Sequence, residues 1–296
     1  MGKRWLINLV LLCIIVILGG FVYYTTEQEK SNKQLTKLTK LDQNKVQLIR
    51  IERADKTRIS LMKDKSKIWQ MLTPFQLPAN MIYINRLLQI LSERQYKKLD
   101  VSKQSLAELK LDPPLAKVIF NQFAISFGDS SPMRDQKRYI LIDDEVYLVT
   151  DNFYNSLTQN ATSFVSLAPL GLNSKITELK LPDYHLIFKE KQWILISSKF
   201  SDKEVETNQD ALAGLIDQWQ RLQAFKVETY DVKTESQGEI EVHLVGKDHP
   251  LSFTILASKP DLILAHRDKN VLYKIDNSQI DKLLQLPTAN REDLGD

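Results

Sequence analysis

Three landmarks of the sequence recur at a nearly constant spacing, and this repetition constrains the fold more than any other feature. Each copy has a tryptophan in a short apolar–polar alternation, an asparagine before an amphipathic stretch, and a tyrosine in a later alternation. The pairs are Trp69 and Trp193, Asn80 and Asn208, and Tyr147 and Tyr273, with offsets of 124, 128 and 126 residues. Offsets that agree this closely over more than 100 positions indicate duplication of one unit.

Each copy is predicted to hold short strands on either side of one amphipathic helix. Apolar–polar alternation is the period of a half-buried strand, and the asparagine is a preferred N-cap for the apolar stripe that follows it. A short helix near residues 106–109 and a closing helix from Asp151 are also expected. The expected strands are 49–52, 59–62, 68–71, 118–120, 123–127, 139–142 and 146–149, then 176–181, 186–189, 193–196, 240–244, 251–255, 262–265 and 271–275.

The fold class predicted from these elements is α+β, with one N-terminal transmembrane helix before two tandem domains. The sheets are expected to be mainly antiparallel, because most connections between strands are short. The first domain is expected over residues 41–170 and the second over 171–296. The residues expected to fill the core of the repeats are Trp69, Leu88, Trp193 and Ile216.

The transmembrane helix is predicted for residues 5–24, a run without charge in which only Asn8 is strongly polar. A helix of that length would span roughly 30 Å, the hydrocarbon thickness of a bilayer. Trp5 at one end and Tyr23 and Tyr24 at the other are typical of the membrane–water interface.

The charges beside this run predict its orientation. Lys3 and Arg4 precede it, so the positive-inside rule places residues 1–4 in the cytoplasm and the bulk of the chain across the membrane. Residues 25–40 contain no aromatic residue and two leucines, which predicts a solvated stalk or linker. A frayed extension of the membrane helix with a basic face is the alternative.

A cleaved signal peptide is the alternative for the apolar run itself. Its apolar core would span about 7–15 residues and end at a pair of small residues spaced for cleavage. Here the run is longer, and bulky side chains follow Gly19 and Gly20, so an uncleaved anchor is favoured. The two glycines would also permit close approach of a neighbouring helix.

The charge distribution argues against nucleic-acid binding. The net charge is +3, and residues 1–50 hold eight basic and three acidic side chains, so the remaining residues carry −2. A nucleic-acid binder would place its positive charge on the folded part. The single cysteine excludes an internal disulfide and a cysteine-based zinc site.

No motif in the sequence predicts catalysis, a cofactor or a metal. Ser60 and Lys63 match the S-x-x-K pattern of acylating enzymes, but they lie in an expected strand rather than on a helix. Asp143, Asp144 and Glu145 fit a turn better than a calcium loop, and the nine glycines form no phosphate-binding loop, so ATP is not expected to bind. The four histidines are too scattered for a recognisable metal site: His185, His243, His249 and His266.

Several stretches resemble one protein family along nearly the whole chain. They are M-x-K-R-W-L-x-N-L-V at the N-terminus, Ile49-x-Ile51-Glu52-Arg53, Ile68-Trp69, Leu109-x-Leu111-Asp112-Pro113-Pro114, Phe127-Gly128-Asp129, Arg138-Tyr139-Ile140 and Val146-Tyr147-Leu148. Together these resemble the repeat of the bacterial domain-of-unknown-function family forty-three-forty. Lys110 stands where the family commonly has glycine, which argues against a tight turn at that position.

The resemblance implies a cellular context rather than a chemistry, because the family has no established activity. Members often have one N-terminal span, and many are encoded beside ABC-type export components related to the gliding-motility system. The chain is therefore predicted to be a non-enzymatic, single-pass protein of the bacterial inner membrane. Its bulk would be periplasmic, and it would partner an ABC-type permease.

Two other functions are left open by the sequence. One is an envelope hydrolase acting on glycan or lipid, whose carboxylates would converge in space without a linear motif. The other is an envelope assembly or structural factor without a transporter. Any small-molecule ligand is expected in the cleft between the repeats.

Overall fold

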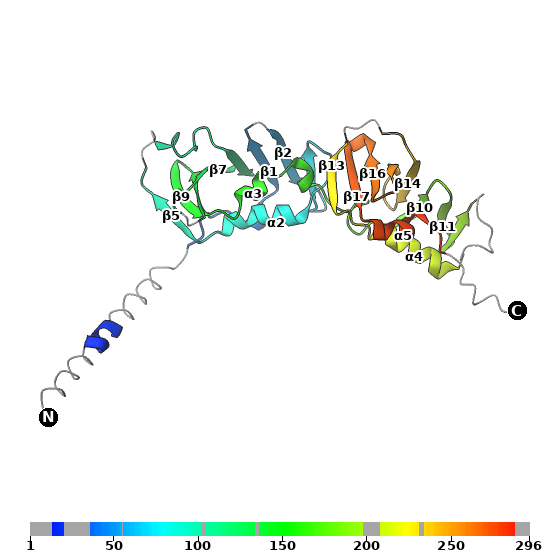
Figure 1. Ribbon diagram of the computed structural model, residues 1–296, viewed down its shortest axis with the longest axis horizontal. Coiled ribbons are helices and arrows are strands. Elements are labelled where there is room, and N and C mark those ends of the chain that lie inside the picture. The colour runs from blue at the N-terminus through cyan, green and yellow to red at the C-terminus, as the bar shows by residue number, and fades with distance from the viewer. Residues whose placement is uncertain are drawn as a thin grey trace, which may run out of the picture.

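Two antiparallel sheets lie side by side along the long axis of the molecule (Figure 1). The computed structural model describes residues 14–20, 36–54, 56–101, 105–133, 136–197, 208–230 and 234–287. Among these residues the first sheet has nine strands in the order β4-β3-β2-β1-β6-β7-β8-β9-β5. They are β1 (Leu48–Arg53), β2 (Lys56–Lys63), β3 (Trp69–Thr73), β4 (Leu77–Pro78), β5 (Tyr96–Leu99), β6 (Ala116–Phe120), β7 (Phe123–Ser130), β8 (Lys137–Ile142) and β9 (Glu145–Thr150).

The second sheet repeats the connectivity of the first. Its order within the described chain is β12-β11-β10-β14-β15-β16-β17-β13, which matches the first sheet strand for strand apart from the short edge strand β4. Its strands are β10 (Ile176–Lys180), β11 (His185–Lys189), β12 (Gln192–Ile196), β13 (Lys226–Thr229), β14 (Gly238–Leu244), β15 (Leu251–Ala257), β16 (Leu262–His266) and β17 (Val271–Ile275). Two sheets with one order of connection are what a duplicated unit would produce.

One helix in each repeat joins opposite edges of its sheet. α2 (Met81–Gln89) runs between β4 and β5, and α4 (Gln209–Gln220) runs between β12 and β13. The predicted asparagine caps are both present: the side chain of Asn80 accepts a hydrogen bond from the backbone N–H of Ile82, and that of Asn208 accepts one from Ala211. Each helix therefore starts where its cap satisfies a free N–H.

The remaining helical segments are short. α3 (Tyr154–Leu157) and α5 (Ile280–Leu284) are single turns that follow the last strand of each sheet. The 3₁₀ segments are η1 (Gln43–Lys45), η2 (Ile90–Ser92), η4 (Ala161–Phe164), η5 (Arg267–Lys269) and η6 (Asn277–Gln279).

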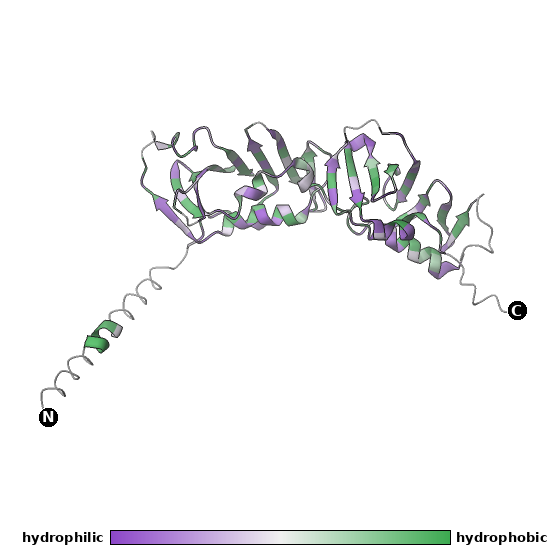
Figure 2. Cartoon of the chain, viewed as in Figure 1, coloured by the Kyte–Doolittle hydropathy of each residue, from purple (hydrophilic) through white to green (hydrophobic). Residues whose placement is uncertain are grey.

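The alternation of the strands creates the core. β6 and β14 bury every second residue, and Figure 2 shows the resulting change of hydropathy along the strands. The apolar faces of α2 and α4 belong to the same buried cluster, which continues from the first sheet into the second. The two repeats are thus joined by packed side chains as well as by the chain.

The predicted α+β class is wrong, because sheets dominate and helices are few. The helix expected near residues 106–109 is a series of turns, and the helix expected from Asp151 is the four-residue α3. Three strands that the alternation did not predict, β4, β5 and β13, extend the sheets instead.

The transmembrane helix predicted for residues 5–24 is not found among the residues that the structure describes. The part of the chain that the structure describes holds no helix long and apolar enough to cross a membrane. Residues 14–20 are helical, whereas residues 5–13 and 21–24 lie outside the described ranges.

A tight turn forms at Lys110, although this residue is not glycine. Its φ is 53°, in the left-handed region that side chains other than glycine adopt at a cost. The backbone N–H of Leu111 donates to the carbonyl of Leu106 at 2.8 Å, and Lys110 Nζ lies 2.7 Å from Asp129 Oδ2. The turn that Lys110 argued against is therefore present.

The free energy of unfolding is expected to decrease when the pH is lowered from about 6.5, because of His266. This side chain is buried against the ring of Phe253, and its Nδ1 atom has no hydrogen-bond partner. Burial lowers the pKa of His266 from its ordinary 6.5. The positive charge of Lys269 also lowers this pKa, whereas the negative charge of Asp268 raises it. The unfolded chain therefore binds more protons as the pH falls through 6.5, and the free energy of unfolding decreases until the folded-state pKa is reached.

Urea denaturation between pH 8 and pH 5 measures this effect. His266→Phe should flatten the profile, whereas His249→Gln, at an exposed turn, should leave it unchanged. An unchanged slope in His266→Phe would show that other groups cause the pH dependence.

Candidate functional site

The two repeats meet where strand β13 packs against η4 (Figure 1). The segment that contains η4 is fixed to the edge of the first sheet: Asn80 N donates to Phe164 O, and Ser166 N donates to Pro78 O, both at 2.8 Å. It is also bonded to the second repeat, since Ala224 N donates to Leu167 O at 2.8 Å. The junction is therefore held by backbone hydrogen bonds on both sides.

A cavity of about 1050 Å³ opens at this junction. Its walls come from the end of β1 and the start of β2, from the N-terminal part of α2, from η4, and from β13. The side chains that give it chemical character are Arg53, Lys56, Tyr83, Arg86, Phe225 and Lys226. At the upper end of the size range of small-molecule sites, it is the strongest candidate for a ligand site in the described residues. We call it the junction cavity.

Arg53 is the most constrained cation of the junction cavity. Its Nη1 atom donates to the carbonyl oxygens of Leu157 and Gln159, and its Nη2 atom donates to that of Thr57 at 2.6 Å. Its Nε atom is buried and has no partner. Burial lowers the pKa of Arg53, because the charged guanidinium has lost water and gained only neutral carbonyls. The site thus holds a fixed, half-buried positive charge.

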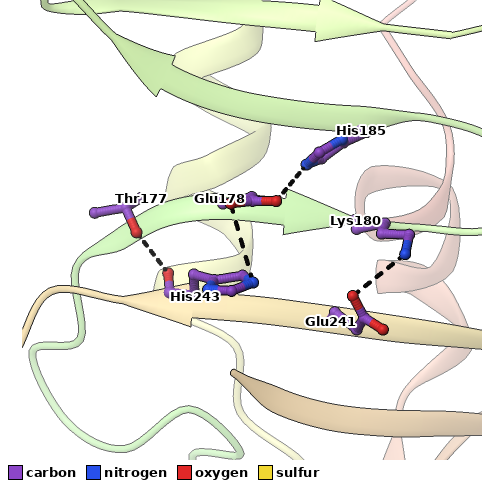
Figure 3. A network of polar contacts seen from close by, with 6 residues as sticks. All are labelled: Thr177, Glu178, Lys180, His185, Glu241 and His243. Atoms are coloured by element: carbon purple, nitrogen blue, oxygen red, sulfur yellow. Dashed lines mark hydrogen bonds and ion pairs between the residues drawn. The ribbon is translucent and has the colours of Figure 1, made fainter. Parts of the chain in front are cut away.

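A second polar cluster lies on the outer face of the second sheet, as Figure 3 shows. Glu178 on β10 lies between two histidines: His185 Nε2 is 2.7 Å from Glu178 Oε1, and His243 Nε2 is 4.0 Å from Glu178 Oε2. Beside them Lys180 Nζ is 3.3 Å from Glu241 Oε2. The described residues hold no group of three or more histidine, cysteine or acidic side chains that could bind a metal. This cluster is therefore a set of cross-strand polar pairs.

The residues singled out in the sequence lie in three different places. Trp69, Leu88 and Ile216 are buried, and Trp193 is half-buried beside Phe188, with ring centroids 5.0 Å apart. Gly19 and Gly20 are helical, with no atom within 4 Å of a Cβ built on either. The others lie outside the described residues: Lys3, Arg4, Trp5, Asn8, Tyr23 and Tyr24.

None of the cations of the junction cavity was identified from the sequence. Arg53 was noted only as part of a family motif, and Lys56, Arg86 and Lys226 belong to no motif. They come from three segments that the fold brings together, so their spacing along the chain carries no signal. The expectation that a ligand site would lie between the repeats was the only indication of this region.

The fold and the junction define a class of protein: two tandem antiparallel-sheet domains with a basic cavity where they meet. The model of the family described as "Domain of unknown function (DUF4340)" matches residues 69–237, more than half of the chain. The chain belongs to this family, which confirms the resemblance seen in the sequence. No curated protein and no solved structure matches it.

Proposed function

We propose that this chain is a non-enzymatic accessory subunit that docks onto an ABC-type export complex of the bacterial inner membrane. Its two sheets would lie on the extracytoplasmic side, and its apolar N-terminal residues would associate with the membrane. The uncharged, apolar run of residues 5–24 and the genomic context that the family resemblance implies support this location.

The observation that carries the docking role is a pair of exposed apolar strips on equivalent strands of the two sheets. In the second sheet Ile194 and Ile196 are 45% and 52% exposed, and Ile187 lies directly opposite Ile194 on the neighbouring strand. They alternate with Trp193 and Leu195, which pack against the core. In the first sheet the corresponding strands β2 and β3 and their connection expose Met62, Ile68 and Leu72.

Apolar strips of this kind are typical of surfaces that bind another protein. Exposed apolar side chains are ordinary when scattered, but a contiguous group on a regular sheet face indicates an interaction site. Because the strip recurs at equivalent strands of both repeats, the chain offers two similar contact surfaces. A membrane complex with repeated or symmetric subunits would suit such a pair.

Chemical crosslinking in native membranes followed by affinity purification tests the proposal. The full chain should recover a permease and its ATPase, and deletion of residues 5–24 should abolish the recovery. The double variant Ile194→Lys and Ile196→Lys should reduce recovery about tenfold, because two charges would be buried at the interface. The matched control, Gln89→Lys with Asn277→Lys, adds the same charge at exposed positions outside the strips.

Two outcomes would contradict the proposal. Recovery of the full chain alone would remove the export complex as partner. Equal recovery by the strip variant and by its control would show that the apolar strips are not the docking surface.

A further inference from the structure

The charges that line the junction cavity are unbalanced. Its described walls carry four cations, Arg53, Lys56, Arg86 and Lys226, but only one carboxylate, that of Glu228. Glu228 is already engaged by two lysines: Lys226 Nζ lies 2.6 Å from one of its oxygens and Lys274 Nζ lies 2.9 Å from the other. These two lysines account for the low pKa of Glu228 and leave it little capacity for a third cation.

The three other cations have no acidic partner among the described residues. Arg53 donates only to backbone carbonyls, and Lys56 Nζ donates to Thr158 O at 2.6 Å. Arg86 lies over the ring of Tyr83, 5.5 Å from its centroid. Of the three, Arg53 is half-buried with only neutral partners, which is costly, and an anion that enters the cavity would offset that cost.

The remaining walls combine neutral polar residues, such as Asn80 and Gln159, with several large apolar side chains. Phe75 and Tyr83 come from the first repeat and Phe225 from the second, and Ile82 and Phe225 remain 58% and 53% exposed. Exposed apolar side chains beside unpaired cations suit a ligand that has both a charged group and an apolar body. The volume of about 1050 Å³ is sufficient for a headgroup together with part of an acyl chain.

We propose that the junction cavity binds an amphiphilic phosphate monoester with net negative charge, with its phosphate at Arg53, Lys56 and Arg86 and its apolar chain against Phe75, Tyr83 and Phe225. Three unpaired cations favour a phosphate over a singly charged carboxylate. Three of the five N–H groups of the Arg53 guanidinium donate to carbonyls and Nε is buried, which leaves one Nη2–H for a charge-assisted hydrogen bond to a phosphate oxygen. The proposal adds a ligand to the proposed accessory role and rests on that role only for the membrane source of such a ligand.

Calorimetric titration of the purified full chain in an uncharged amphipol tests the proposal. Three probes separate the contributions: dihexanoyl phosphatidic acid, dihexanoyl phosphatidylcholine with the same chains and no net charge, and inorganic phosphate with no chain. Phosphatidic acid should bind at least about tenfold more tightly than either of the others, because only it uses both parts of the cavity.

Variants assign the binding to the cavity. Lys56 and Arg86 are exposed, so the double variant Lys56→Gln and Arg86→Gln should fold normally and weaken phosphatidic acid binding about tenfold. Arg53→Gln should weaken it further, and a thermal melt of this variant reports whether the loss of its bonds to Leu157, Gln159 and Thr57 affects folding. The matched control is Arg58→Gln, an exposed cation on β2 that pairs with Glu52 outside the cavity.

The results that would overturn the proposal are distinct from failure of the docking role. Equal binding of phosphatidic acid and phosphatidylcholine would exclude selection of a phosphate headgroup with net negative charge, and equal binding of phosphatidic acid and inorganic phosphate would exclude the apolar contribution. No binding to the folded chain, or equal weakening by the double variant and by Arg58→Gln, would exclude the cavity. Each measurement uses the chain without its partner. Ligand binding can therefore be absent while the export complex is still recovered, and it can be present when no complex is recovered.

Discussion

Replacement of Trp219 by alanine is expected to lower the free energy of unfolding by about 3–5 kcal/mol. Trp219 on α4 is fully buried, and its indole Nε1–H donates to the carbonyl of Leu283 on α5 at 2.9 Å. The variant would lose the packing of the largest fully buried side chain and leave a cavity between the two helices and the sheet. A loss of this size is a large fraction of the stability of a typical domain, so the second repeat should unfold at much lower denaturant concentration.

Two further variants separate packing from hydrogen bonding and from tryptophan content. Trp219→Phe keeps an aromatic ring and loses only the N–H donor and part of the volume, so a loss of about 1–2 kcal/mol is expected. Trp193→Ala removes a half-buried tryptophan of the same repeat and should also cost only about 1–2 kcal/mol. Urea unfolding followed by circular dichroism makes the comparison independent of tryptophan fluorescence. Equal losses in Trp219→Ala and Trp193→Ala would show that burial does not determine the effect.

Most of the regular structure was predictable because its sequence patterns follow the physics of burial. Strands such as β6 and β14 alternate apolar and polar residues because one face of each strand packs on the core. The two helix starts were predictable because Asn80 and Asn208 are N-caps in front of an apolar stripe. Both signals are local, so a single sequence suffices to recognise them.

Strands β5 and β13 were missed because they lie at the edges of their sheets. β5 has the sequence Tyr-Lys-Lys-Leu and no fully buried side chain, and β13 buries only Val227. Edge strands often carry charged residues, which oppose pairing with other chains and also remove the alternation that would reveal a strand. The α+β prediction arose because β5 and β13 were missed and because helices were expected near residues 106–109 and from Asp151, where the structure has turns and the four-residue α3.

The junction cavity could not be predicted for a different reason. Arg53 and Lys56 lie where β1 turns into β2, whereas Lys226 lies about 170 residues later on β13. Their proximity depends on the order of strands in both sheets and on the packing of β13 against η4. The sequence shows the charges, but only the fold shows that Arg53, Lys56 and Arg86 have no acidic partner among the described residues.

A second large loss of stability is expected for Gly128→Ala, because Gly128 lies where two stretches that resemble the family are in direct contact. A Cβ atom at Gly128 would lie 2.2 Å from the carbonyl oxygen of Leu109 and 2.9 Å from side-chain atoms of Leu111. The stretch Leu109–Pro114 therefore packs directly on the stretch Phe127–Asp129, and Asp129 N donates to Leu109 O at 2.8 Å. Glycine is required here by close approach of two backbones.

The clash cannot be relieved by rotation of a side chain, because the nearest atom belongs to the backbone. One strand would have to move, and the carbonyl of Gly128 would then lose its bond from Arg138 Nη1, at present 2.6 Å long. Arg138 is buried and also pairs with Asp151 at 2.8 Å, so the shift would disturb a buried ion pair. Gly128→Ala is therefore expected to lower the free energy of unfolding by about 3 kcal/mol or more.

The same substitution in α4 provides the control with the opposite sign. Gly214 lies inside α4, and a Cβ built there meets no atom within 4 Å. Gly214→Ala should raise the free energy of unfolding by about 0.5–1 kcal/mol, since alanine restricts the unfolded chain and favours the helix. Urea unfolding of both variants and of the parent chain measures these two changes in the free energy of unfolding. If Gly128→Ala were as stable as the parent chain, the packing of the two motifs against each other would be excluded as the reason for glycine at this position.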